Sequence, residues 1–190
     1  MQLNDLNEKV LVEKAKQDPQ AFALLFDKYY QVILSYAFHR TLNTELAQDI
    51  TSETFLKAFN ALNRFTWREI SFGAWLYRIA TNELNMYFRK GKYKPVSLNY
   101  LQNQFGFDAI DFSTTELERN RHEMEEKTYE DFIFLQSKIN ELPAKYQDVL
   151  ALRYFEHKSV KEIAVILEKK EGTIKSLLSR AIEKLKEFLQ

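Results

Sequence analysis

Apolar side chains recur every three or four residues over several long stretches, and this period restricts the fold more than any other feature of the chain. Such spacing gathers apolar residues on one face of an α-helix, whereas a half-buried strand would alternate at every second residue. Only four glycines and three prolines occur in 190 residues, so the turn residues that strand-rich folds use are scarce. The sequence therefore predicts an all-α protein.

Three helices are expected in the first half, and a short one can precede Asp18. Asp18 can cap a helix that begins at Pro19, Thr44 opens a second helix, and a third runs from about Phe72 to Lys90. The inward-facing residues are expected to be Phe22, Leu25, Phe26, Tyr29 and Ile33 in the first helix, Leu46, Ile50, Phe55, Ala58, Phe59 and Leu62 in the second, and Phe72, Leu76, Ile79 or Ala80, Leu84 and Tyr87 in the third.

The helical period fades after the third helix and resumes near Tyr129. Between residues 108 and 131 acidic residues outnumber basic ones nine to three, whereas basic residues lead eleven to eight from there to the end. A structureless run this long is unusual inside one compact domain. We therefore expect two small helical domains, residues 1–90 and 129–190, joined by a flexible, partly acidic linker over 91–128.

The last part of the chain has the pattern of a helix-turn-helix. Ser159 and Glu162 form a capping box that begins a short helix, and a break from Glu168 to Lys170 precedes a longer one. A helix of this kind fits the major groove of DNA, where basic and hydroxyl side chains reach bases and phosphates. A plain helical hairpin with a solvated face would give the same pattern. The outward-facing residues are Thr173, Lys175, Ser176, Ser179, Arg180 and Lys184.

The composition restricts where in the cell the protein is expected and which kinds of catalytic or metal site it can have. Cysteine is absent, which excludes disulfides and thiolate metal sites and fits a reducing compartment. No signal peptide and no apolar run of ~20 residues is visible, so we expect a cytoplasmic protein without membrane insertion. His39, His122 and His157 are far apart, and neither a nucleophile elbow nor a phosphate-binding glycine loop occurs. We therefore expect no catalysis, no metal and no cofactor.

Three segments resemble, in the expected order, parts of the extracytoplasmic-function (ECF) sigma factors, which belong to the sigma-70 family of RNA polymerase initiation factors. The segment AQDITSETFLKAF resembles the polymerase-binding helix, SFGAWLYRIATNELNMYFRK the helix that engages the −10 promoter element, and LPAKYQDVLALRYFEHKSVKEIAVILEKKEGTIKSLLSRAIEKLKEFL the domain that binds the −35 element. The resemblance implies promoter-specific transcription initiation. The implied partners are core RNA polymerase, through its clamp coiled coil and flap, promoter DNA and an anti-sigma factor.

The resemblance also implies site residues. Docking on the polymerase coiled coil is expected for Gln48, Asp49, Ser52, Glu53, Leu56 and Lys57, although a solvated face would look the same. Aromatic and basic groups beside the third helix would hold bases removed from the duplex. The −10 candidates are Arg64, Trp67, Arg68, Arg78, Asn82, Asn85 and Arg89. In the C-terminal domain, Lys175, Ser176 and Arg180 match positions that face the −35 element.

Three residues depart from the family pattern. Met86 stands where an aspartate is common, and Glu168 stands where the turn often has glycine. A residue other than glycine is strained at positive φ, so we expect the turn at Glu168 to differ. Leu177 replaces a frequent arginine, so we expect Leu177→Arg to add a phosphate contact and to tighten DNA binding.

Two rival functions remain at this point. A conventional regulator with a sensory domain would bind duplex DNA alone, and an enzyme would need a catalytic site. Run-off transcription with core polymerase distinguishes both from a sigma factor. The acidic linker is expected to pass through the polymerase interior, with a solvated tether as the alternative.

Overall fold

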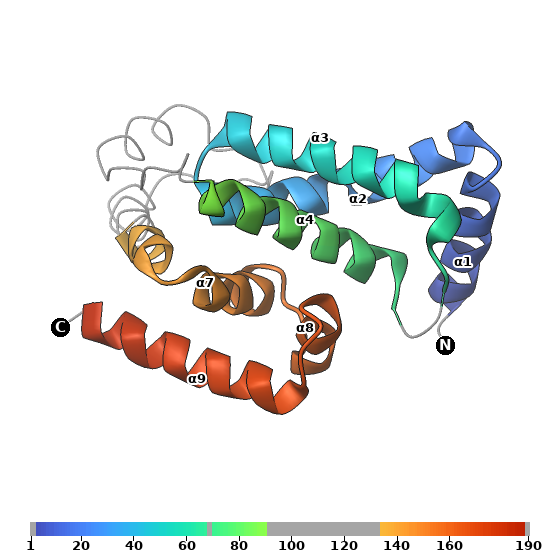
Figure 1. Ribbon diagram of the computed structural model, residues 1–190. Helices are drawn as coiled ribbons and strands as arrows, with labels where there is room; N and C mark the ends of the chain where they lie inside the picture. Colours follow the sequence, from blue (N-terminus) through green and yellow to red (C-terminus); the bar gives the residue numbers. More distant parts are fainter. Residues whose placement is uncertain (1–2, 68–69, 91–133, 189–190) are drawn as a thin grey trace, which may run out of the picture.

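The computed structural model describes residues 3–67, 70–90 and 134–188, which form two helical domains (Figure 1). The all-α prediction is confirmed. The predicted linker, residues 91–128, and the helix start near Tyr129 lie outside the described residues. The N-terminal domain holds α1 (Leu3–Ala15), α2 (Pro19–Thr41), α3 (Thr44–Ala61), the 3-10 helix η1 (Leu62–Arg64) and α4 (Phe72–Arg89), and the C-terminal domain holds a helical segment over 134–141, α7 (Ala144–Leu150), the π-helical turn η2 (Ala151–Phe155), α8 (Val160–Ile166) and α9 (Glu171–Phe188).

The helices of the N-terminal domain begin where the sequence supplies caps. Side-chain oxygens of Asp18, Asn43 and Ser71 accept hydrogen bonds from backbone N–H groups in the first turns of α2, α3 and α4. Each cap satisfies an N–H group that has no partner within its helix. The helix starts predicted at Pro19, Thr44 and Phe72 are therefore confirmed.

The N-terminal core lies between α2, α3 and α4, with α1 packed against α2 (Figure 1). The expected inward residues are buried or half-buried, except Phe59, which is 44% exposed. The prediction for Phe59 is wrong: its ring lies at the edge of the core, where it packs edge-on against Phe22 at 4.9 Å between centroids. Two threonines of the same helix, Thr51 and Thr54, are buried, and their hydroxyls donate to backbone carbonyls four residues earlier.

Gly73 lies at the start of α4 against the Tyr29 ring of α2. A Cβ at this position would lie 2.8 Å from Cε1 of the Tyr29 ring. The absence of a side chain therefore lets the two helices approach, and the Tyr29 ring packs against Phe72 at 5.7 Å between centroids.

The C-terminal domain has the predicted helix-turn-helix. The capping box is present: the Ser159 N–H donates to Glu162 Oε2 at 2.8 Å, and the Glu162 N–H donates to Ser159 Oγ at 3.3 Å. Partial burial alone would raise the pKa of Glu162, but the hydrogen bonds from Ser159 outweigh it and lower that pKa. Glu168 has φ 53°, which is the left-handed conformation that glycine adopts without strain, so the expectation that this turn would differ is wrong for this backbone angle.

Leu177 lies in the core of this domain and not on its outer surface. It is 9% exposed, on the same side of α9 as Ile174 and Ala181, which are fully buried. Positions three and four residues apart share a helix face, so Leu177 completes the apolar stripe that these two begin. The expectation that Leu177 occupies a DNA-facing position is therefore wrong.

Candidate functional site

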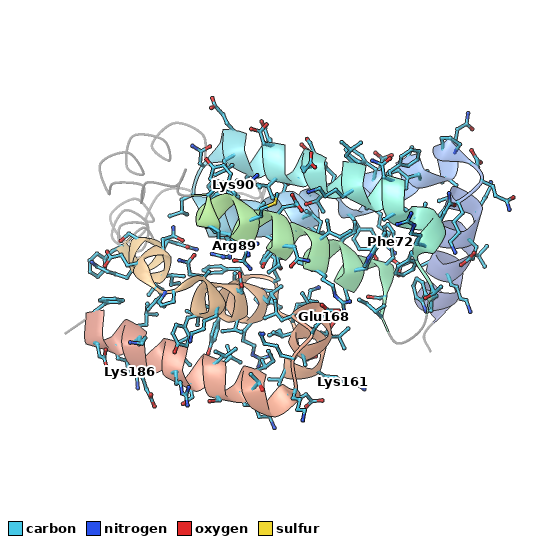
Figure 2. The ribbon with its side chains drawn as sticks, in the orientation of Figure 1. Phe72, Arg89, Lys90, Lys161, Glu168 and Lys186 are labelled. Atoms are coloured by element: carbon cyan, nitrogen blue, oxygen red, sulfur yellow. The ribbon has the colours of Figure 1, made fainter. Side chains whose placement is uncertain are left out.

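The outer face of α9 carries every −35 candidate. All six side chains are exposed. Because the apolar stripe of α9 is buried against α7 and α8, the hydroxyl and basic groups are held on a rigid helix that faces away from the rest of the molecule. Figure 2 shows Lys186 near the C-terminal end of the same helix. This face can contact phosphates and base edges.

The outer face of α3 carries the candidates for polymerase docking. Gln48, Asp49, Ser52 and Glu53 are exposed, and Leu56 is 54% exposed beside the exposed ring of Phe59. The surface is thus a mixture of carboxylates, polar groups and apolar side chains, which suits a protein partner.

Lys57 is the one docking candidate that is not exposed, and its ammonium group is paired with carboxylates of its own domain. Its Nζ lies 3.3 Å from Glu53 and donates to the buried carboxylate of Glu83 on α4. The hydrogen bond to Glu83 raises the pKa of Lys57. This side chain therefore fastens α3 to α4, a role that sequence spacing did not indicate.

The −10 candidates on α4 share one face, but two of them already bond to the C-terminal domain. Asn82 and Arg89 are exposed, whereas Arg78 and Asn85 are half-buried against the C-terminal domain. Figure 2 shows Arg89 on the side of α4 that faces α7. The four side chains line one wall of a pocket of about 610 Å³, and Lys145 and residues of the α8–α9 turn line the other.

The other −10 candidates lie before α4. Arg64 is exposed in η1, and Trp67 is half-buried with its ring against Phe65 at 6.2 Å. Arg68 lies outside the described residues. Met86 is half-buried on α4.

A buried charge cluster joins α2 and α4 to α7. Arg40 is 1% exposed and Asp148 is 5% exposed. The Arg40 Nε donates to Asp148 Oδ1 at 3.1 Å, its Nη2 lies 2.8 Å from the same oxygen, and Asn85 Nδ2 donates to Oδ2 at 3.1 Å. Arg40 also donates to Gln147 and lies over the Phe88 ring at 5.2 Å.

A second cluster joins α4 to the α8–α9 turn. The Arg78 guanidinium donates to Glu168 Oε1 at 2.7 Å, to the Val165 carbonyl at 2.6 Å and to the Ile166 carbonyl at 3.3 Å. It therefore satisfies the carbonyls at the C-terminal end of α8, where a cation is favoured. Figure 2 shows Glu168 on the side of the turn nearest α4.

Aromatic groups form a third contact between the domains. The Tyr77 hydroxyl donates to Glu156, and the His39 ring stacks on Phe155 at 4.3 Å with 14° between planes. Burial, with the nearby Glu156 carboxylate, raises the pKa of Tyr77 far above its ordinary value, so the hydroxyl stays protonated as a donor. Arg40 and Asp148 are 108 residues apart and Tyr77 and Glu156 are 79 apart, so helical spacing gave no signal for either pair.

No group of three or more His, Cys, Asp or Glu side chains in the described residues is placed to hold a metal. None of the described helices has the length and apolar character needed to cross a membrane.

Each of the two domains matches a known protein family. Residues 25–93 match the family model Sigma-70 region 2, and residues 135–185 match Sigma-70, region 4. The chain is 31% identical to the ECF RNA polymerase sigma factor SigW of Bacillus subtilis, with 96% of each chain covered.

Two solved structures share the fold. CnrH, in complex with the cytosolic domain of CnrY, has a TM-score of 0.66 at 19% identity, with 96% of each chain covered. The sigma factor RpoE, in complex with the anti-sigma factor NepR from Bartonella quintana, has a TM-score of 0.60 at 22% identity, covering 88% of this chain and 96% of that one.

Proposed function

The chain belongs to the ECF sigma factors of the sigma-70 family, which bind core RNA polymerase and promoter DNA, and we propose that α4 reads the −10 element while α9 reads the −35 element. The observation that supports this division is that each domain carries its own helix face of polar and basic side chains. On α9 the face is Thr173, Lys175, Ser176, Ser179, Arg180 and Lys184, and on α4 it is Arg78, Asn82, Asn85 and Arg89.

On α4 the side chains suit a single strand. Asn82 and Asn85 offer both donors and acceptors to the edges of unpaired bases, and Arg78 and Arg89 can contact phosphates. Trp67, with Arg64 and Arg68, would supply a stacking surface for a base taken out of the duplex, which is worth ~1–3 kcal/mol per base.

On α9 the side chains suit duplex DNA. Lys175 and Arg180 would contact phosphates or guanine edges, and Ser176 and Ser179 can adapt to several partners. A matched test compares Arg180→Ala with Lys186→Ala, since Lys186 is near the far end of the same helix. We expect Arg180→Ala to weaken −35 binding about tenfold, and equal binding by both variants would contradict the assignment.

Polymerase docking is proposed for the outer face of α3. The two carboxylates Asp49 and Glu53 lie four residues apart and can meet basic side chains across an interface. We expect Asp49→Arg to weaken binding to core polymerase at least tenfold without changing the thermal midpoint, because the side chain is exposed. Asp27→Arg, an equal charge reversal on α2, is the control, and unchanged pull-down by Asp49→Arg would contradict the docking site.

An anti-sigma partner is also proposed. RpoE, a protein of the same fold, is in complex with the anti-sigma factor NepR. Leu56 and Phe59, 54% and 44% exposed on α3, offer an apolar surface that such a partner or the polymerase could cover. We propose further that the acidic linker passes through the polymerase interior, where basic channels accept negative charge.

The decisive experiment is run-off transcription of genomic DNA by core polymerase with and without the purified chain. A sigma factor produces RNAs that start at defined sites sharing two upstream elements. A regulator that binds duplex DNA alone would leave initiation by core polymerase unspecific, and that result would overturn the proposed function.

A further inference from the structure

We propose that the cavity between α4, α7 and the α8–α9 turn binds a nucleotide that carries two or more phosphates. The cavity has a volume of about 610 Å³, and its walls come from both domains. Pockets of ~300–1,000 Å³ hold small organic ligands, whereas an inorganic phosphate ion would leave most of this space unfilled. The proposal depends on the cavity and its charges, and it does not depend on which promoter element each helix reads.

The wall of the cavity has an excess of positive charge. It contains four cationic side chains and two carboxylates. Both carboxylates are already paired, Asp148 with Arg40 at 2.8 Å and Glu168 with Arg78 at 2.7 Å. Three cations of the wall remain without a carboxylate partner among the described residues: Arg89, Lys145 and Lys169. A cleft lined by charges of one sign attracts ligands of the opposite sign, so the cavity favours a polyanion.

The paired charges fix the backbone that carries the unpaired lysines. Arg78 donates to Glu168 and to two carbonyls at the end of α8, which holds the turn that contains Lys169 against α4. On α7, Asp148 follows Lys145 by three residues, so the two share a helix face. The buried bonds of Asp148 to α2 and α4 turn that face toward α4. The positions of both lysines are therefore set before a ligand binds, which lowers the entropy cost of binding.

The rest of the wall suits a base and a sugar. Phe88, Ala144 and Leu167 supply apolar surface on which a flat ring can pack. Asn82 is exposed on α4 and offers both a donor and an acceptor to the edge of a base. A nucleotide combines a planar base with phosphates, whereas a sugar phosphate lacks the base and a nucleoside lacks the charge. A nucleotide is therefore the class of ligand that uses both parts of the wall.

The two lysines are not explained by the proposed promoter contacts. Lys145 lies on α7 and Lys169 lies in the turn before α9, and both are exposed. Neither belongs to the −10 face of α4 or to the −35 face of α9. A ligand small enough to enter the cavity and long enough to reach both walls would use these charges together with that of Arg89.

Isothermal titration calorimetry of the full chain tests the class of ligand. The probes are ATP, GTP, AMP, adenosine and pyrophosphate, each without added metal. We expect ATP or GTP to bind about tenfold more tightly than AMP and pyrophosphate, and adenosine to give no binding heat. Absence of binding by ATP and GTP at millimolar concentrations overturns the proposal. Pyrophosphate that binds as tightly as both triphosphates overturns the assignment to a nucleotide.

Lysine variants test the place of binding. Lys145→Ala and Lys169→Ala should each weaken binding of the tighter triphosphate about tenfold, because each removes a charged contact to phosphate. Their thermal midpoints should not change, since both side chains are exposed. Lys161→Ala is the matched control, because Lys161 is an exposed lysine of α8 that does not line the cavity. Equal affinities of all three variants overturn the site, since general attraction to positive charge would then account for binding.

Photolabelling locates the base independently of the charges. The full chain is irradiated with 8-azido-ATP, and the labelled peptides are identified by mass spectrometry. Labels should lie on α4 or at the start of α7, and an excess of ATP should remove them. Labels confined to the outer face of α9 overturn the proposal. Neither measurement uses polymerase or a promoter, so the nucleotide site and the sigma function can fail separately.

Discussion

Leu177→Arg tests how α9 is oriented, because a Leu177 that faces DNA and a Leu177 that faces the core predict opposite results for this substitution. If Leu177 faced DNA, the arginine would add a phosphate contact. In the structure it is 9% exposed and packs with Ile174 and Ala181. Removing a buried leucine forfeits about 1.5–3 kcal/mol of burial, and the guanidinium must also leave the core to reach water.

We therefore expect Leu177→Arg to lower the stability of the C-terminal domain by at least about 2 kcal/mol. Chemical unfolding followed by circular dichroism measures this loss. Binding to −35 DNA should weaken in proportion to the unfolded fraction, without a steeper dependence on salt.

Ser176→Arg is the matched control because it places the same side chain on the neighbouring, exposed position. It should leave the unfolding midpoint unchanged and steepen the slope of log affinity against log salt by about 0.9, the value for one added phosphate contact. A Leu177→Arg protein that unfolds like the unmodified chain and binds DNA more tightly would refute the inward orientation.

Two further predictions concern stability. Glu162→Gln should lower the free energy of unfolding by about 0.3–1 kcal/mol at neutral pH. Because folding lowers the pKa of Glu162, the stability that its carboxylate contributes is present above the unfolded pKa and is lost as pH falls through the folded pKa. Urea midpoints of the two proteins that differ equally at pH 7 and at pH 2.5 would contradict this prediction. Gly73→Ala should destabilise the N-terminal domain by about 1–3 kcal/mol, because its Cβ would meet the Tyr29 ring; an unchanged or higher melting temperature would show that the ring yields.

The helices could be predicted from the sequence because helix caps and the helical spacing of apolar residues depend only on residues a few positions apart. Asp18 and the Ser159–Glu162 capping box marked helix starts that the structure contains. The errors at Phe59 and Leu177 occur where one position more or less on the helix decides between core and solvent. The burial of Thr51 and Thr54 was not predicted either, because a threonine whose hydroxyl bonds to a backbone carbonyl can be buried although its side chain is polar.

Contacts between the domains were beyond sequence reasoning for a different reason. Arg78 and Asn85 were identified from their face on α4, but their partners are 90 and 63 residues away. Spacing along one helix carries no information about which charge lies opposite on another. Glu168 keeps positive φ where a different turn was expected, and the sequence gave no sign that its carboxylate accepts a hydrogen bond from Arg78.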